Sequence, residues 1–182
     1  MPPAPTGLTP EQAAQVQAWI GGPGSPRAWR EVYRATRDGF GAADFHRLCD
    51  GVPRLLVLIR VQGQTWLFGG FTPVGFRAGS PGCYTDPGAF LFTLVNSAGL
   101  PPTKFASKGD GHSIFSHASR SVHFGGGHDI FICDNAHTQA NSSTNMNGTS
   151  YQAPPAGGPH MLSGGVKRGW LVAEVVAWAV PA

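Results

Sequence analysis

The chain has 182 residues, 41% of them hydrophobic, which is enough for one globular domain with its own core. Its 26 glycines and 16 prolines, with only 13% charged residues, favour turns and short strands over long helices, so we expect an α+β fold that is mainly β. The net charge is +3, but the 13 lysines and arginines form no basic run, which argues against nucleic acid as a partner.

The first predicted elements are two short helices. After a Pro-rich lead over residues 1–8, a helix is predicted from residue 9 to about residue 20, and a second from 40 to 49. Residues 9–182 are interpreted as one domain, because no linker or repeat interrupts them. The first helix is indicated by Thr9 as N-cap, Pro10 in the first turn, Gln12 in a capping box, and Gly21 as the stop; the second is indicated by Phe40, Phe45, Leu48 and Cys49 at helical spacing, followed by Gly51.

The strongest strand signal is a hairpin over residues 55–71 with its turn at Gly63. The first arm is an unbroken aliphatic run, which is typical of a strand covered on both faces. In the second arm, alternation places Trp66 and Phe68 on one face and Phe71 on the other. A hairpin is marginal alone, so we expect further strands and helices to cover it.

Further strands and loops follow in alternation. We predict strands over 89–95, 113–117, 121–124, 128–133 and 170–180, a turn-rich loop over 73–87, and a long polar surface loop over 134–150.

The last predicted strand carries one carboxylate, Glu174. Alternation predicts that it shares a face with Trp170, Val172, Val176 and Trp178. Burial of an unpaired carboxylate costs several kcal/mol. Glu174 therefore needs an Arg, a Lys or backbone N–H donors, an exposed sheet edge, or a raised pKa of the kind that functional carboxylates have. Of these we favour a structural partner.

The candidate reactive groups do not form a recognisable catalytic or metal motif. Three cysteines, Cys49, Cys83 and Cys133, are an odd number without CxxC spacing, which indicates a reducing compartment. A Cys–His pair stays open, for example Cys49 with a histidine of another segment. Five of the seven histidines fall between residues 112 and 137, but no HxH or HExxH occurs, so we expect no metal site and no cofactor. Gly125–Gly127 precede a strand, which indicates a turn and not a phosphate-binding loop.

The location is predicted from what the sequence lacks. No apolar run is long enough to span a bilayer, and the first residues lack the basic and apolar segments of a secretory signal. We therefore expect a cytoplasmic protein without membrane insertion, and a nuclear or mitochondrial location is compatible with the same residues.

The chain also contains a series of short motifs. The motif positions are Trp29, Tyr33, Asp38, Gly39, Phe68, Gly69, Phe90, Phe92, Phe124, Gly125, Gly127, Asp129, Glu174 and Trp178. No single motif is specific, but their order is. In this order, from about residue 9 to the end, the chain resembles the TLDc domain family of the oxidation-resistance proteins.

The resemblance implies two antiparallel sheets in a β-sandwich with flanking helices. It implies a role in resistance to oxidative stress and binding to the cytosolic part of the V-ATPase, with no settled catalytic mechanism, so no catalytic residue is assigned. We expect a non-enzymatic interaction module that contacts its partner through the loops 75–86, 108–112 and 134–150 and through exposed sheet edges. The alternative is a small-molecule enzyme or redox protein that uses Cys49, Cys133 or Glu174.

Overall fold

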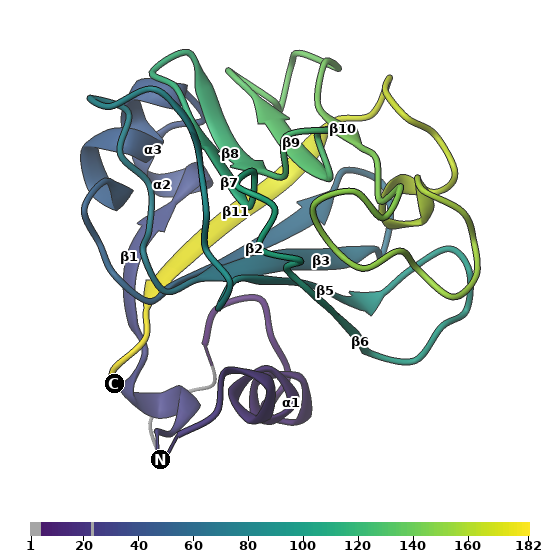
Figure 1. Cartoon of the computed structure of the whole chain (residues 1–182), viewed down its shortest axis with the longest axis horizontal. Helices are drawn as coiled ribbons and strands as arrows, with labels where there is room; N and C mark the ends of the chain where they lie inside the picture. Colours follow the sequence, from purple (N-terminus) through teal and green to yellow (C-terminus); the bar gives the residue numbers. More distant parts are fainter. Residues whose placement is uncertain (1–4, 23) are drawn as a thin grey trace.

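The computed structural model describes residues 5–22 and 24–182, and shows two antiparallel β-sheets packed face to face (Figure 1). The first half of the predicted Pro-rich lead, residues 1–4, lies outside the described part. The six-stranded sheet has the order β1 (Arg30–Arg34), β11 (Val172–Ala179), β2 (Leu55–Val61), β3 (Leu67–Thr72), β5 (Phe90–Val95) and β6 (Thr103–Ala106). The five-stranded sheet has the order β10 (Ser143–Thr144), β9 (Ile130–Cys133), β8 (Arg120–Phe124), β7 (Ile114–Ser116) and β4 (Gly82–Tyr84).

The predicted hairpin is at the centre of the six-stranded sheet. β2 and β3 pair antiparallel, and the turn between them contains Gly63 with a φ of 71°. β2 is buried along both faces except at Arg60, because β3 and β11 lie on either side of it and both faces of the sheet are covered. Phe68 packs between the two sheets and Phe71 on the opposite face, as alternation predicted.

The main core fills the space between the two sheets. Each sheet contributes the inward side chains of alternating positions, and the six-stranded sheet supplies Val57, Ile59 and Phe68. The five-stranded sheet supplies Ile114, Val122, Phe124, Ile130 and Ile132. These positions confirm the predicted sandwich, which is mainly β.

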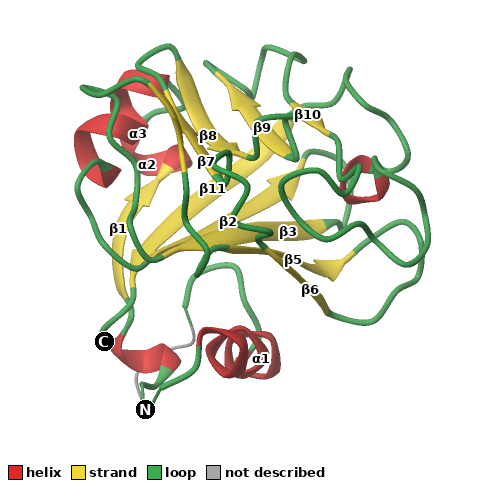
Figure 2. Ribbon diagram, in the orientation of Figure 1, coloured by secondary structure: helices red, strands yellow, loops and turns green. Residues whose placement is uncertain are grey.

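Helix α1 (Pro10–Ile20) covers the outer face of the six-stranded sheet (Figure 2). The predicted start is confirmed, since the Thr9 side chain accepts a hydrogen bond from Gln12 N and the Gln12 side chain accepts one from Thr9 N. Val16 is fully buried in a second hydrophobic cluster that includes Phe92 and Trp178.

The second predicted helix begins two residues later than expected, as α3 (Ala42–Cys49). Gly39 has a φ of 108°, which ends the short helix α2 (Ala35–Asp38) and turns the chain, so Phe40 stays outside α3. Phe40 instead stacks on His137 with ring centroids 4.3 Å apart. The first N–H of α3, on Ala42, donates to Asp134 Oδ1 at 2.7 Å.

The predicted face of the last strand was wrong at its start. Trp170 and Val172 pack into the core between the sheets, whereas Val176 and Trp178 pack on the α1 side. The register of β11 against β2 shifts between Val172 and Glu174, which is a β-bulge. One extra residue in a strand reverses the alternation beyond it.

Several strands escaped the sequence analysis because they are short or lack alternation. These are β1, β4, β6 and β10, together with the short helix α2. The prediction that residues 134–150 form a surface loop was wrong in part, since Ser142, Ser143, Thr144 and Met146 are buried. Thr144 Oγ1 finds a partner inside, Ser163 Oγ at 2.6 Å, whereas Ser143 Oγ is buried with none among the described residues.

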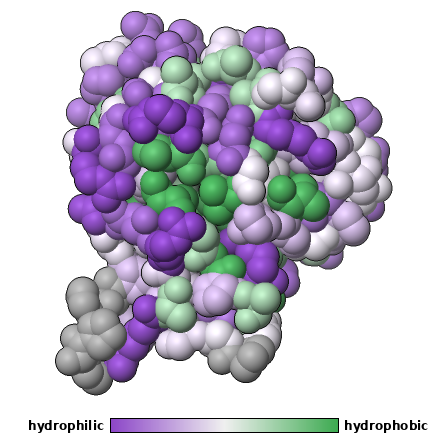
Figure 3. Space-filling model, turned by 90° about the vertical axis from the view of Figure 1, so that its left-hand side faces the viewer, coloured by the Kyte–Doolittle hydropathy of each residue, from purple (hydrophilic) through white to green (hydrophobic). Residues whose placement is uncertain are grey.

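The side of the molecule that carries β1, α2 and α3 shows hydrophobic residues near its centre, framed by hydrophilic ones (Figure 3). Partly buried Val32 on β1 and Leu48 on α3 are among the side chains that pack against the core from these elements. β1 is also an edge strand, so this side of the sheet has one open row of backbone groups.

Candidate functional site

The three loops predicted to contact a partner meet at one cavity. Its volume is about 340 Å³. The first loop contributes Cys83, and the glycine triplet joins the others. The full lining is Cys83, Asp110, His112, Gly126, Gly127, Thr149 and Ser150. Segments that are about seventy residues apart in sequence are thus neighbours in the fold, and we call this place the loop site.

Backbone and side-chain hydrogen bonds hold the loop site together around Ser150. Lys108 N donates to Ser150 O at 2.9 Å, and Ser150 Oγ donates to Asp110 Oδ2 at 3.2 Å. Gly126 N is 3.0 Å from His112 O and 3.3 Å from Ser150 Oγ, so one N–H joins the glycine triplet to both other loops. The site is therefore preorganised, which lowers the entropy cost of binding a partner.

Asp129, which follows the glycine triplet, is buried below the loop site. Its side chain is 0% exposed, and neither carboxylate oxygen has a well-formed hydrogen bond. Gly125, with a φ of 81°, makes room for it, because a Cβ at Gly125 would lie 1.9 Å from Asp129 Oδ2. Burial raises the pKa of Asp129 to about 7, and the charge of Asp110 adds to this, while nearby backbone N–H groups of Asp129 and Tyr151 lower the pKa less.

The two buried cysteines have structural surroundings. Burial, followed by the charges of Asp50 and Asp38, raises the pKa of the Cys49 thiol far above its usual range. Cys133 Sγ donates to Gln139 O at 3.2 Å and accepts from Ser142 Oγ at 3.4 Å. Both thiols belong to the core between the sheets, and neither lines the loop site.

Cys83 is the exposed thiol of the chain and lies at the loop site. We expect a thiol-alkylating reagent to label Cys83 in the native protein, and Cys49 and Cys133 only after denaturation. Labelling will be slower than for a free thiol, because partial burial and the charge of Asp110 raise the Cys83 pKa. Peptide mass spectrometry after timed quenching measures this, and early modification of Cys49 would contradict it.

Glu174 has the structural partner that we favoured from the sequence. Its Oε1 accepts from Thr36 N at 3.1 Å and from Val175 N at 3.0 Å, and its Oε2 accepts from the Thr36 hydroxyl. The carboxylate thus ties β11 to α2, which follows β1 in the chain. Glu174 is half-buried in the structure.

Replacement of Glu174 by alanine should therefore lower the free energy of unfolding by about 1 to 2 kcal/mol, less than for a fully buried charge. Chemical denaturation of the variant and the parent protein measures the difference. Thr36→Val should remove part of the same interaction, so the double variant should lose less than the two single losses together. An unchanged midpoint with lost partner binding would instead make Glu174 a binding residue.

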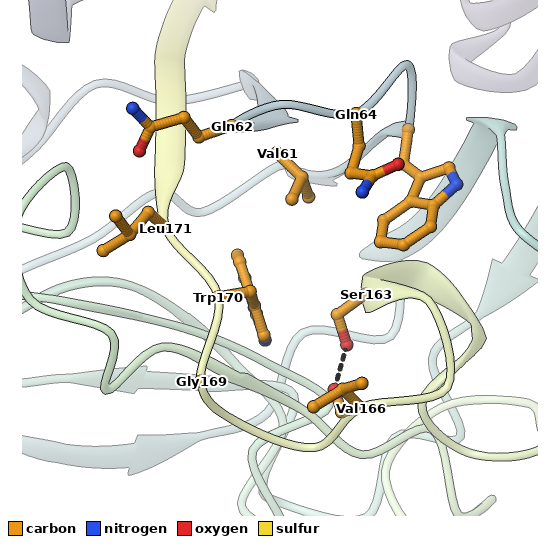
Figure 4. A pocket seen from close by; sticks show the side chains of 9 residues that line it. Val61, Gln62, Gln64, Ser163, Val166, Gly169, Trp170 and Leu171 are labelled. Atoms are coloured by element: carbon orange, nitrogen blue, oxygen red, sulfur yellow. Dashed lines mark hydrogen bonds between the residues drawn. The ribbon is translucent and has the colours of Figure 1, made fainter.

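A second cavity, of about 440 Å³, lies between the β2–β3 turn and the loop before β11 (Figure 4). Trp66 and Trp170 line it, with Gln62 and Gln64 from the turn. The indole N–H of Trp170 is buried and has no hydrogen-bond partner among the described residues. The Ser163 hydroxyl donates to the backbone oxygen of Val166 at 2.6 Å. Its lining is uncharged and aromatic, unlike that of the loop site.

The motif positions spread over the fold, and most of them hold it together. Trp29 Nε1 donates to Gln17 Oε1 at 2.8 Å, and Tyr33 OH donates to Gly39 O at 2.8 Å. Asp38 forms an ion pair with Arg37 at 2.7 Å. The motif positions buried in the two hydrophobic clusters or in the central strands are Phe68, Gly69, Phe90, Phe92, Phe124 and Trp178. Those at or under the loop site are Gly125, Gly127 and Asp129.

Sequence analysis did not identify a group of aromatic and cationic side chains on β7, β8 and β9. Arg120 lies over the rings of Phe115 and Phe131, and near His123 and His128. A signal was present in the alternation, since Phe115, His123 and Phe131 are out of phase with the core residues next to them. Within the described ranges, no three His, Cys, Asp or Glu side chains are placed to hold a metal ion.

Over the described residues, no helix is long and apolar enough to cross a membrane.

Two comparisons with known proteins concern the whole chain. No curated protein sequence matches the chain. A family model, described as the TLDc domain, matches residues 6–168. That match covers most of the 182 residues and ends before β11 and Glu174. The chain therefore belongs to the TLDc domain family.

Proposed function

We propose that this protein is a non-enzymatic, cytoplasmic interaction module that binds the cytosolic part of the V-ATPase and supports resistance to oxidative stress through that partner. The observation that carries the proposal is the meeting of the three loops at one preorganised site. The partner itself is suggested by family membership. Loops on a rigid sandwich are common binding surfaces, because sheet positions are needed for the core.

The positions of the candidate reactive groups support a module without its own chemistry. Cys49 and Cys133 are in the core, and Glu174 ties β11 to α2. An enzyme that used any one of these residues would need it in a polar cavity within reach of a histidine. Cys49 and Cys133 instead pack among apolar side chains between the sheets, and the Glu174 carboxylate is held by backbone N–H groups and the Thr36 hydroxyl.

The decisive experiment is a pull-down of the tagged protein from cytosolic and membrane fractions, with the pump intact and disassembled. We expect pump subunits to be recovered in at least one state. Thr149→Arg places a bulky charge at the rim of the loop site and should abolish recovery. Thr65→Arg, at an exposed threonine of the β2–β3 turn, is the matched control and should not. Failure to recover any pump subunit from a source that contains the pump would overturn the partner.

Protection from peroxide should not depend on the cysteines. In complemented cells, replacement of Cys49, Cys83 and Cys133 by alanine or serine should leave survival unchanged, provided the variant folds, because a catalytic peroxide cycle needs an accessible low-pKa thiol. Circular dichroism establishes the folding. If the variant is folded and survival falls to the level of cells without the protein, the redox alternative would be favoured.

A further inference from the structure

The outer face of the five-stranded sheet is not covered by a helix in the way that α1 covers the other sheet. Phe115, His123 and Phe131 alternate with core residues on β7, β8 and β9, so they face outward. His123 and Phe131 are directly paired across the two strands.

Arg120 is the centre of this surface. Its guanidinium carbon is 4.9 Å from the ring centroid of Phe115 and 5.4 Å from that of Phe131. Its NH1 atom is 3.4 Å from His123 Nδ1 and 3.5 Å from His128 Nε2. A guanidinium can only donate hydrogen bonds, so both imidazoles must present an unprotonated nitrogen to it.

The surroundings of both histidines are cationic. Burial, followed by the charges of His128 and Arg120, lowers the pKa of His123 to about 3. Burial also lowers the pKa of His128, and after it the charges of Arg120, Arg168 and Lys167. Among the described carboxylates, none forms an ion pair with Arg120, Lys167 or Arg168. The positive charge of this surface is therefore not neutralised within the chain.

We propose that this surface, formed by Phe115, Arg120, His128, Phe131, Lys167 and Arg168, binds an acidic segment of a partner protein. Lys167 and Arg168 are exposed, and the two phenylalanines and His128 are half-buried, so a peptide can reach all of them. Carboxylates would pair with the three permanent cations. The aliphatic parts between them would contact the half-exposed rings, which is how acidic and apolar residues are recognised together.

A peptide fits this surface better than a phosphate group does. Phosphate sites usually present several free backbone N–H groups. In the adjacent glycine triplet, Gly125 N already donates to Ser113 O, and Gly126 N donates to His112 O. Directly after the triplet, His128 N donates to Gly125 O. The cations are instead spread from β8 to the loop before β11, as an extended chain of carboxylates requires.

This inference does not rest on the proposed V-ATPase partner. Its six residues do not line the loop site, although Phe115 is paired with Cys83 of that site, and any protein with an accessible run of Asp or Glu could supply the segment. The two proposals therefore have separate tests and separate ways to fail.

The test is fluorescence anisotropy of a labelled oligoglutamate peptide with the full chain, at low and at physiological salt. We expect binding that weakens as salt rises. Lys167→Gln with Arg168→Gln changes two exposed side chains and should weaken binding about tenfold, equivalent to about 1.4 kcal/mol. Arg120→Gln should weaken it by at least as much. Lys104→Gln is the matched control, because Lys104 also lies over an aromatic ring, that of Phe90 at 4.4 Å, but on the other sheet.

The pH dependence identifies where the peptide lies. His128 is close to His123 and Arg120 on β8, and to the charges of Lys167 and Arg168 on the loop before β11. A bound carboxylate would raise the pKa of His128 again. Affinity should then increase from about pH 8 to about pH 6. His128→Asn should remove this increase while retaining binding at the higher pH, because asparagine tolerates the left-handed φ of 64° at this position.

Three outcomes would overturn the inference. They are no binding of the peptide at low salt, equal weakening by Lys104→Gln and by the Lys167→Gln/Arg168→Gln pair, and tighter binding of inorganic phosphate than of the peptide at equal charge. Circular dichroism of each variant shows whether it is folded. Since Lys167 and Arg168 are exposed, their variant remains a valid test even if Arg120→Gln does not fold.

Discussion

Gly69→Ala should lower the free energy of unfolding by about 3 kcal/mol or more, which is one of the largest effects we expect from a single methyl group in this chain. Gly69 is in β3, between β2 and β5. A Cβ there would lie 1.9 Å from the carbonyl oxygen of Val57 and 2.9 Å from the Phe92 ring. The nearest atom is backbone, so the two central strands must separate to accommodate it.

Urea denaturation of the parent and variant proteins measures the loss. Gly63→Ala is the matched control, because Gly63 has a φ of 71° and no atom within 4 Å of an added Cβ. It should cost only about 1 to 2 kcal/mol, the conformational cost of a left-handed alanine. Equal losses for the two variants would show that close strand packing at Gly69 is not the reason for its glycine.

Asp129→Asn should remove a decline in stability that the parent protein shows as pH rises. The pKa of Asp129 is raised to about 7 in the folded state, first by burial, and is about 3.9 when the chain is unfolded. The folded protein therefore holds a proton that the unfolded chain has lost. The contribution of Asp129 to the stability of the fold is fully present below about pH 4 and is lost as pH rises through about 7.

The largest loss that this shift allows is about 4 kcal/mol above pH 7. Urea midpoints measured from about pH 5 to about pH 8 test it, and the asparagine variant should show a flatter profile and a higher midpoint at the alkaline end. Glu11→Gln is the control, since the Glu11 pKa is lowered by its own backbone N–H and by Thr9, and the decline should persist. A parent profile that rises over this range would contradict the prediction.

These two predictions concern residues with different places in the fold. Gly69 is in β3, one of the two central strands of the six-stranded sheet. Asp129 lies under the loop site, and the charge of Asp110 at that site acts on it. The negative charge of Asp110 thus disfavours ionisation of Asp129. Binding of a cationic partner group at the loop site should favour the ionised form.

The sequence by itself determined the elements whose signals are local. The N-cap Thr9, Pro10 and Gln12 are consecutive or nearly so, and they set the start of α1 without help from other segments. The aliphatic run of β2, the Gly63 turn and the alternation of β3 likewise specify a hairpin, and the order of motifs specifies the family. Local hydrogen bonds and side-chain period decide these features.

Only the tertiary structure decided which distant residues meet. The bulge before Glu174 arises from pairing with β2, and it reverses which face Trp170 and Val172 occupy. The pairing of β1 with β11 is likewise made across the whole length of the chain. Strand register and sheet order depend on packing between segments that no local pattern records.

The sites follow the same division. Each loop of the loop site was predicted as a loop, but its meeting with the glycine triplet depends on how β4, β7 and β8 pair. Arg120 is more than forty residues from Lys167 and Arg168, so these cations looked scattered in the sequence. They share one surface because the loop before β11 returns beside the loop after β9, where Gly169 N donates to Ala140 O at 3.1 Å. All three charges lower the pKa of His128, since the electrostatic field of a protein depends on distance in space and not along the chain.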